Sequence, residues 1–144
     1  MKIICIDTLT RFFVKADTTL LRDDEPYFDP NFGSVFSQTQ GRAVRITRIV
    51  KCIEARFAYR AWSEWFCCVE HRVNDVDEQM GRNFDRSFAV DGRIFDKTTL
   101  SEADQLAFDQ AISYVTKYIS LRVGDYVFVP DEVMKKYIQN MSSK

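Results

Sequence analysis

Four acidic residues follow one apolar stretch of the sequence closely enough that they could bind a metal ion together. Glu70 directly follows the apolar run 65–69, and the turn-forming residues after it contribute Asp75, Asp77 and Glu78. Carboxylates that converge at short range can hold Mg²⁺ or Mn²⁺, because hard cations prefer charged oxygen ligands. Acidic residues at turns are more often solvated, so the cluster fits either a metal site or an ordinary surface.

The single histidine adds little to such a site. His71 is adjacent to Glu70, and adjacent side chains on a strand point to opposite faces of a sheet. Imidazole also suits softer metals than the magnesium or manganese that carboxylates select. We therefore expect Glu70 and His71 to be solvated or hydrogen-bonded structural residues.

Four cysteines give no sign of a zinc or redox site. Cys5, Cys52, Cys67 and Cys68 include no Cys-x-x-Cys pair, and the two adjacent thiols would diverge on a strand. We expect all four to be buried, reduced thiols. No nucleophile–base pair or phosphate-binding loop in the sequence indicates another class of enzyme.

The charge balance gives no sign of a nucleic-acid-binding protein. Twenty basic and twenty-one acidic residues leave a formal net charge of −1 and a pI near 5.8, without a long run of one sign. No segment approaches the ~20 apolar residues of a membrane span, and the apolar stretch at the N-terminus is too short for a signal peptide. We expect a cytoplasmic protein with neither nucleic acid nor membrane as a partner.

The composition is that of one folded domain. The chain has 144 residues, of which 46% are hydrophobic and 14% aromatic, and this is enough for a single core. We place the domain at residues 1–139 and expect the polar segment 140–144 to be a frayed tail. The many aromatic rings could fill that core or cover an interface, and apolar spacing does not separate these two interpretations.

Hydrophobic periodicity and turn signals predict strands and helices in mixed order. Apolar or alternating runs predict strands at 1–6, 12–15, 42–50, 65–69 and 126–129. Helical spacing and capping residues predict helices at 53–62 and 102–119, a turn and helix at 74–79, and a terminal helix capped by Asp131. The sequence therefore predicts an α+β fold with a compact mixed sheet and two or three helices.

Several separated stretches of the chain follow the order of a known family. Residues 1–6 read as its first strand, 12–21 as its lysine-proline-x-threonine segment with Ala16 in place of proline, and 42–64 as its next strand and helix. The strongest match is 112–128, which follows a late helix, turn and strand almost position by position. Over about half of its length the chain thus resembles the fumarylacetoacetate hydrolase family, metal-dependent enzymes that cleave, isomerise or decarboxylate small oxo-acids.

The resemblance implies a metal site that this chain has mostly lost. In the family, a glutamate-x-glutamate pair and an aspartate hold Mg²⁺, Mn²⁺ or Ca²⁺. Alignment of the strand at 42–46 places Thr39 and Gly41 at the two glutamate positions, while Glu70 takes the position of the aspartate. Neutral residues would leave a divalent cation largely uncompensated, so we expect no cofactor and interpret Glu70 as a vestigial metal ligand.

The resemblance also implies losses around the substrate. The family's first loop and lid helix, which supply an arginine, a histidine and a glutamate, would fall between Ile6 and Phe12, where five residues remain. Residues 129–132 stand where the family has a loop rich in glycine and threonine. Lys15 and Arg86 are left as the remnant of an anion-binding pocket.

Three functions stay open. We favour a pseudoenzyme, a shortened and non-catalytic derivative of the family that acts as a binding or self-association module, as a homodimer or with another protein partner. The alternative is a metal-dependent hydrolase, isomerase or decarboxylase of small oxo-acids, with a reduced Mg²⁺ or Mn²⁺ site in the acidic cluster around Glu70. The third is a small-molecule-binding domain in which Lys15 and Arg86 hold an anionic ligand.

Overall fold

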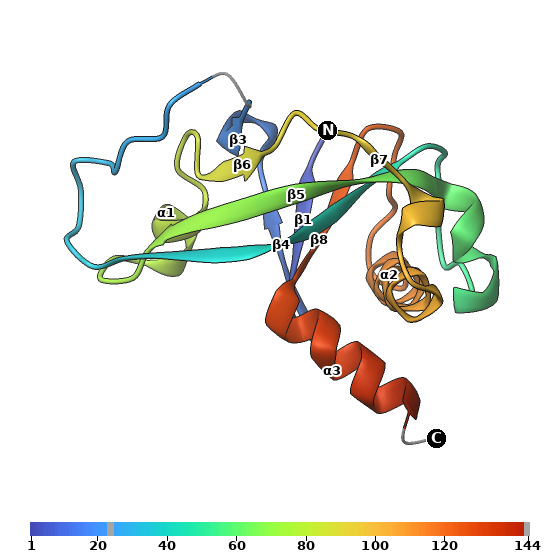
Figure 1. Cartoon of the computed structure of the whole chain (residues 1–144). Helices are drawn as coiled ribbons and strands as arrows, with labels where there is room; N and C mark the ends of the chain where they lie inside the picture. The colour runs from blue at the N-terminus through green and yellow to red at the C-terminus, as the bar shows by residue number, and fades with distance from the viewer. Residues whose placement is uncertain (23–24, 143–144) are drawn as a thin grey trace.

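The chain folds into one mixed β-sheet with helices packed against it (Figure 1). A computed structural model describes residues 1–22 and 25–142. The strands are β1 (Ile3–Thr8), β2 (Arg11–Lys15), β3 (Leu20–Leu21), β4 (Phe36–Ile46), β5 (Trp62–Val73), β6 (Phe88–Val90), β7 (Phe95–Asp96) and β8 (Tyr126–Pro130). The α-helices are α1 (Glu78–Arg82), α2 (Glu102–Thr116) and α3 (Asp131–Ser142), and the 3₁₀-helices are η1 (Asp17–Thr19), η2 (Ala55–Ala61) and η3 (Lys97–Thr99).

The strand order brings distant parts of the chain together. It runs β2-β1-β8-β4-β5-β6-β3, with β7 also paired to β5. Strand β1 runs parallel to β8 and β3 runs parallel to β6, whereas the other pairs are antiparallel. The predicted α+β class, mixed sheet and helix content are confirmed. In the described part of the chain, no helix has the length and apolar character that crossing a membrane requires.

Side chains are buried on both faces of the sheet. Helices α2 and α3 cover one face, where Ile4, Ile6 and Phe108 belong to the larger core. Ile3 and Cys5 alternate with them along β1 and belong to a smaller core on the other face. Burial on both faces requires a continuous apolar run, and this explains why β1 shows no alternation of polar and apolar residues.

Several predicted boundaries are corrected by the structure. The strand expected at 42–50 begins at Phe36 and ends at Ile46, because the backbone then turns to donate from Thr47 to the Ala61 carbonyl. The helix expected at 53–62 is the 3₁₀-helix η2, and α2 ends at Thr116 instead of Ile119.

The C-terminal helix also extends further than expected. Helix α3 continues through Ser142, so residues 140–142 of the expected tail are helical, and residues 143–144 lie outside the described part. Met141 packs against the larger core, and this contact stabilises the last turn of the helix.

A glycine allows β8 to approach β4 closely. Gly41 pairs with Pro130, and a Cβ atom added at Gly41 would lie 2.5 Å from the carbonyl oxygen of Val129 and 2.7 Å from the Cα of Pro130. Both are backbone atoms, so neither can rotate away. A longer side chain at this position would force the two strands apart. The packing of the sheet itself therefore keeps a carboxylate out of one of the expected ligand positions.

Candidate functional site

The carboxylate of Glu70 lies inside the protein at the position where a metal ligand was expected. Glu70 is on β5 and pairs directly with Thr39 on β4, and no part of its surface is exposed. Lys15, at the end of β2, is equally buried, and its Nζ lies 3.2 Å from Oε2 of Glu70. A lysine of the same chain is thus one cationic partner of the Glu70 carboxylate.

Two arginines complete the neutralisation of Glu70. Arg82 donates from Nε to Oε2 and from Nη2 to Oε1, both at 3.1 Å, which is the bidentate geometry that suits a guanidinium and a carboxylate. Arg72 donates from Nε to Oε1 at 2.9 Å. Arg82 also donates from Nη1 to Oδ2 of Asp7 at 2.9 Å. We call this group the charge cluster; its members are Asp7, Lys15, Glu70, Arg72 and Arg82.

Helix α1 places Arg82 against the sheet. Asp77 caps the helix by accepting a hydrogen bond from the backbone N–H of Gln79, and the backbone N–H of Gly81 donates to the Asp77 carbonyl. A Cβ atom on Gly81 would collide with the carbonyl oxygen of Val73, so only glycine lets this helix lie so close to β5. The guanidinium of Arg82 then stacks 4.3 Å from the ring centroid of Phe13.

The surroundings keep Glu70 ionised. Burial alone would raise its pKa, but the positive charges of Lys15, Arg82 and Arg72 outweigh burial, and the pKa of Glu70 is lowered. Burial lowers the pKa of Lys15, and Arg82 acts in the same direction against the attraction of Glu70. Burial also works against the charged form of Arg82, yet hydrogen bonds to Asp7 and Glu70 raise its pKa.

The residues at this position do not fit a divalent cation. Thr39 and Gly41 offer no charged oxygen, and the backbone of β8 leaves no space for a side chain at Gly41. The remaining carboxylate, Glu70, already has three cationic partners within 3.2 Å. Among residues 1–22 and 25–142, no group of three His, Cys, Asp or Glu side chains is arranged to hold a metal ion.

The other carboxylates of the predicted cluster have structural partners. Asp75 accepts hydrogen bonds from the backbone N–H groups of Ser34 and Val35, and these bonds, with burial opposing them, lower its pKa. Asp77 is the cap of α1, and Glu78 forms an exposed ion pair with Arg11 at 3.0 Å. Although these carboxylates are close to Glu70 in the sequence, in the structure they bind other partners and do not converge with Glu70.

His71 lies on the opposite face of β5 from Glu70, in agreement with the alternation of a strand. Its ring stacks on Tyr27, with centroids 3.6 Å apart and an angle of 10° between the planes. Burial lowers the pKa of His71, although nearby Asp29 opposes this effect. The structural role expected for His71 is thus a stacking contact that holds the segment before β4 against the sheet.

The cysteines are less uniform than expected. Cys5 and Cys68 are buried, but Cys52 and Cys67 are exposed, and all four are free thiols. Cys67 and Cys68 do point to opposite faces of β5, as the strand pattern requires. Cys52 is exposed and lies in a loop, outside any strand or helix, with a positive φ of 43°.

Lys15 and Arg86 do not form a common anion site. Lys15 has no exposed surface, and its anion is Glu70 of the same chain. Arg86 is more than half exposed and lies 3.7 Å from Glu25. The ligand-binding role predicted for Lys15 and Arg86 stays a prediction, and in the structure the ammonium group of Lys15 already pairs with the carboxylate of Glu70.

Two hollows open near the central strands. One of about 340 Å³ lies beside the charge cluster, with Asp7, Arg72 and Thr39 in its wall. The other, of about 600 Å³, includes Arg42 and Cys67 on the opposite face of the sheet. Asp7 and Arg82 were not identified from the sequence, since each meets Glu70 or its partners only through strand order and the position of α1.

Comparison of the structure with known structures identifies the fold. A fumarylpyruvate hydrolase from Pseudomonas aeruginosa, in complex with Mn²⁺ and pyruvate, matches 90% of this chain and 77% of its own, with a TM-score of 0.75 and 14% identity. The chain has the fold of the fumarylacetoacetate hydrolase family.

Two further structures show the same fold. A protein from Yersinia pestis assigned to the fumarylacetoacetate hydrolase family matches over 90% of this chain and 79% of its own, with a TM-score of 0.75 and 18% identity. A 2-hydroxyhepta-2,4-diene-1,7-dioate isomerase from Mycobacterium marinum covers 89% of this chain and 62% of its own, with a TM-score of 0.71 and 12% identity. No family model matches the sequence, and no curated protein matches it.

Replacing Glu70 with glutamine should destabilise the protein strongly. The substitution leaves Lys15, Arg72 and Arg82 facing one another without an anion, and loss of one partner of a buried ion pair costs about 3–5 kcal/mol. Because the folded-state pKa of Glu70 is lowered, its contribution is present above the ordinary value of 4.5 and is lost as pH falls through the folded value. Urea unfolding between neutral and acidic pH measures both effects.

Glu64→Gln is the matched control, since Glu64 lies on the same strand without an ion pair in the described residues. We expect it to change the free energy of unfolding by less than about 0.5 kcal/mol. Equal stability of the Glu70→Gln variant and the parent protein at neutral pH would show that the charge cluster does not support the fold.

Proposed function

We propose that this protein is a non-catalytic derivative on the fumarylacetoacetate hydrolase fold, a pseudoenzyme that acts as a binding or self-association module. The observation that carries the proposal is the neutralisation of Glu70 by Lys15, Arg72 and Arg82. A carboxylate with three cationic partners inside the protein has no need of an external ion. We expect no metal cofactor for the same reason.

Electrostatics argues against adding a divalent ion to the charge cluster. A doubly charged ion 4 Å from one unit positive charge is repelled by ~8 kcal/mol at an effective dielectric constant of about 20. Three such cations surround Glu70, and only the more exposed Arg72 could swing toward solvent, with 27% of its side-chain surface accessible. Metal binding would therefore require rearrangement of Lys15 and Arg82, both almost fully buried.

The edge of β4 offers a surface for association. Strand β8 pairs with β4 only over residues 41–45, so within the described chain the preceding residues 36–40 pair with β5 alone. This open stretch contains no charged residue; its first residue, Phe36, is 39% exposed, and Val35 before it is 52% exposed. Uncharged open edges tend to pair with another strand, so a second copy or a protein partner fits this surface.

The thiols support a cytoplasmic location as part of the proposal. Cys5 and Cys68 are both free and buried, and burial raises the pKa of each thiol. Reduced, structural cysteines are usual in compartments that keep thiols reduced.

Calorimetric titration with Mn²⁺ and Mg²⁺ tests the absence of a metal site. We expect no one-to-one binding below millimolar concentration, and hydrolysis of an acylpyruvate no faster with the protein than in buffer alone. Stoichiometric Mn²⁺ binding that Glu70→Gln abolishes, together with turnover of an oxo-acid, would instead support the alternative of a metal-dependent hydrolase, isomerase or decarboxylase.

Light scattering of a Phe36→Asp variant tests the association surface. A charge beside the open edge of β4 should weaken a dimer at least about tenfold, because it removes a buried aromatic contact and adds a desolvation cost. Ile94→Asp is the control, since Ile94 is 58% exposed but lies away from this edge, in the loop before β7. A monomeric parent protein, or a dimer that both variants leave intact, would refute this surface.

A further inference from the structure

Exposed cations concentrate on two segments at one end of the protein. In residues 45–60 the exposed basic side chains are Arg45, Arg48, Lys51, Arg56 and Arg60, and residues 117–122 add Lys117 and Arg122. Glu54 is the one acidic residue in these two segments, and it lies 2.8 Å from Arg56. The nearly neutral net charge of the whole chain therefore hides a strongly basic region.

Backbone hydrogen bonds hold these two segments side by side. Val50 and Leu121 exchange N–H···O bonds in both directions at 3.0 Å. The Gly124 N–H donates to the Ile46 carbonyl at 2.8 Å, and the Cys52 N–H donates to the Thr116 carbonyl at 2.9 Å. Cations that are distant in the sequence thus share one anchored surface. We call it the basic edge; its members are Arg48, Ile49, Lys51, Lys117, Arg122 and Val123.

Two aliphatic side chains project among these cations. Ile49 is 65% exposed and Val123 is 63% exposed, and they are among the most exposed large apolar residues of the described chain. Arg48 and Lys51 flank Ile49 closely in the sequence, and Arg122 precedes Val123. The basic edge therefore combines positive charge with apolar groups that no other part of the described chain covers.

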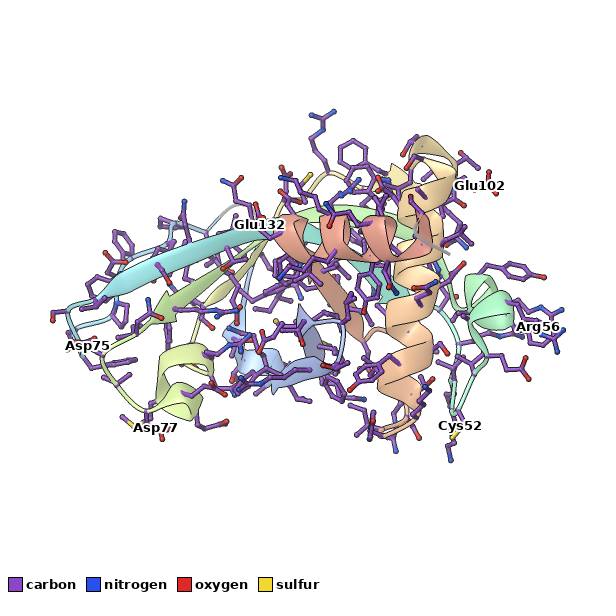
Figure 2. All side chains as sticks on the ribbon, turned by 90° about the horizontal axis from the view of Figure 1, so that it is seen from below. Cys52, Arg56, Asp75, Asp77, Glu102 and Glu132 are labelled. Atoms are coloured by element: carbon purple, nitrogen blue, oxygen red, sulfur yellow. The ribbon has the colours of Figure 1, made fainter. Side chains whose placement is uncertain are left out.

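The positive charge of the basic edge is not balanced locally. Within residues 1–22 and 25–142, no carboxylate lies within ion-pair distance of the side chains of Arg48, Lys51 or Arg122. Figure 2 shows Cys52 and Arg56 at one end of the molecule and the carboxylates of Asp75 and Asp77 at the opposite end. An anionic surface would therefore attract the basic end and repel the other.

We propose that the basic edge binds the surface of an anionic lipid bilayer. Lipid headgroups supply many negative charges without fixed geometry, and the boundary between headgroups and acyl chains accepts side chains such as Ile49 and Val123. This surface lies apart from the charge cluster and does not depend on the non-catalytic role proposed above. It revises the expectation of no membrane partner, which rested on the lack of a spanning segment.

Single-stranded nucleic acid fits this surface less well. Such ligands gain affinity by stacking bases on free aromatic faces. The nearby ring of Phe57 already has the guanidinium groups of Arg56 and Arg60 at 4.6 Å and 5.0 Å from its centroid. Arg60 and Lys97 lie within 6 Å of the Tyr59 ring as well. Tyr118, 65% exposed beside Lys117, has the rings of Tyr114 and Phe12 at 5.4 Å and 6.1 Å from its own ring. The apolar members of the basic edge, Ile49 and Val123, are aliphatic, which suits lipid better than bases.

Co-sedimentation with vesicles tests the proposal. We expect the full chain to bind phosphatidylcholine vesicles that contain about 30% phosphatidylserine and not vesicles of phosphatidylcholine alone. Arg48→Glu with Arg122→Glu should weaken binding roughly tenfold or more, and Ile49→Ser with Val123→Ser about threefold, because charge and burial both contribute. Thermal unfolding of each variant confirms that it remains folded.

Lys135→Glu with Lys136→Glu is the matched control, because it makes the same change of net charge at two exposed lysines of α3. It should weaken binding by less than about twofold. The proposal is overturned if the parent protein does not bind anionic vesicles, or if the lysine substitutions in α3 weaken binding as much as the arginine substitutions in the basic edge. It is also overturned if the substitutions of Ile49 and Val123 do not change binding. A single-stranded oligonucleotide that binds more tightly than the vesicles would also overturn it.

Discussion

An ionised carboxylate inside a protein needs positive charge beside it, and Glu70 receives this charge from Lys15, Arg72 and Arg82. The desolvation of so many charges is costly, so the cluster persists only because bidentate and additional hydrogen bonds satisfy them together. Its members come from β1, β2, β5 and α1. The cluster consequently ties the outer hairpin and the short helix to the long central strand.

The same fold holds Mn²⁺ and pyruvate in a protein of similar structure, the Pseudomonas aeruginosa fumarylpyruvate hydrolase. Fold alone does not decide function, because chemistry depends on the side chains that the fold brings together. In this chain Thr39 lies opposite Glu70 in the sheet, and the cations around Glu70 are Lys15, Arg72 and, from helix α1, Arg82. Because β8 lies so close to Gly41, a carboxylate side chain cannot be accommodated at this position without moving the strand. A single substitution would therefore not restore a metal ligand there.

The sequence predicted the elements with strong local signals. The apolar run of β1, the capped helix α2 and strand β8 were all found, because hydrophobic periodicity and capping residues leave local traces in the sequence. The predicted C-terminal end of β4 was wrong because hydrogen bonds to Ala61 and Gly124, distant in the sequence, set it. The predicted N-terminal end was wrong because residues 36–41 become a strand by pairing with the distant β5. Local patterns carry little information about such partners.

The candidate site was only partly predictable for the same reason. Glu70 and Lys15 were both identified, yet their ion pair was not, since they are 55 residues apart and meet only after the sheet has formed. Arg82 reaches Glu70 because Gly81 lets α1 lie against Val73. No sequence motif predicts this contact between the helix and the strand. The basic edge was missed because its two segments are each short and are joined by the Val50–Leu121 bridge.

Anomalous diffraction from crystals soaked in Mn²⁺ tests most directly whether the protein's own cations take the place of a metal at Glu70. We expect no manganese peak within bonding distance of Glu70, with the ammonium of Lys15 still hydrogen-bonded to its carboxylate. A manganese ion coordinated by Glu70, with Lys15 or Arg82 displaced, would contradict this expectation.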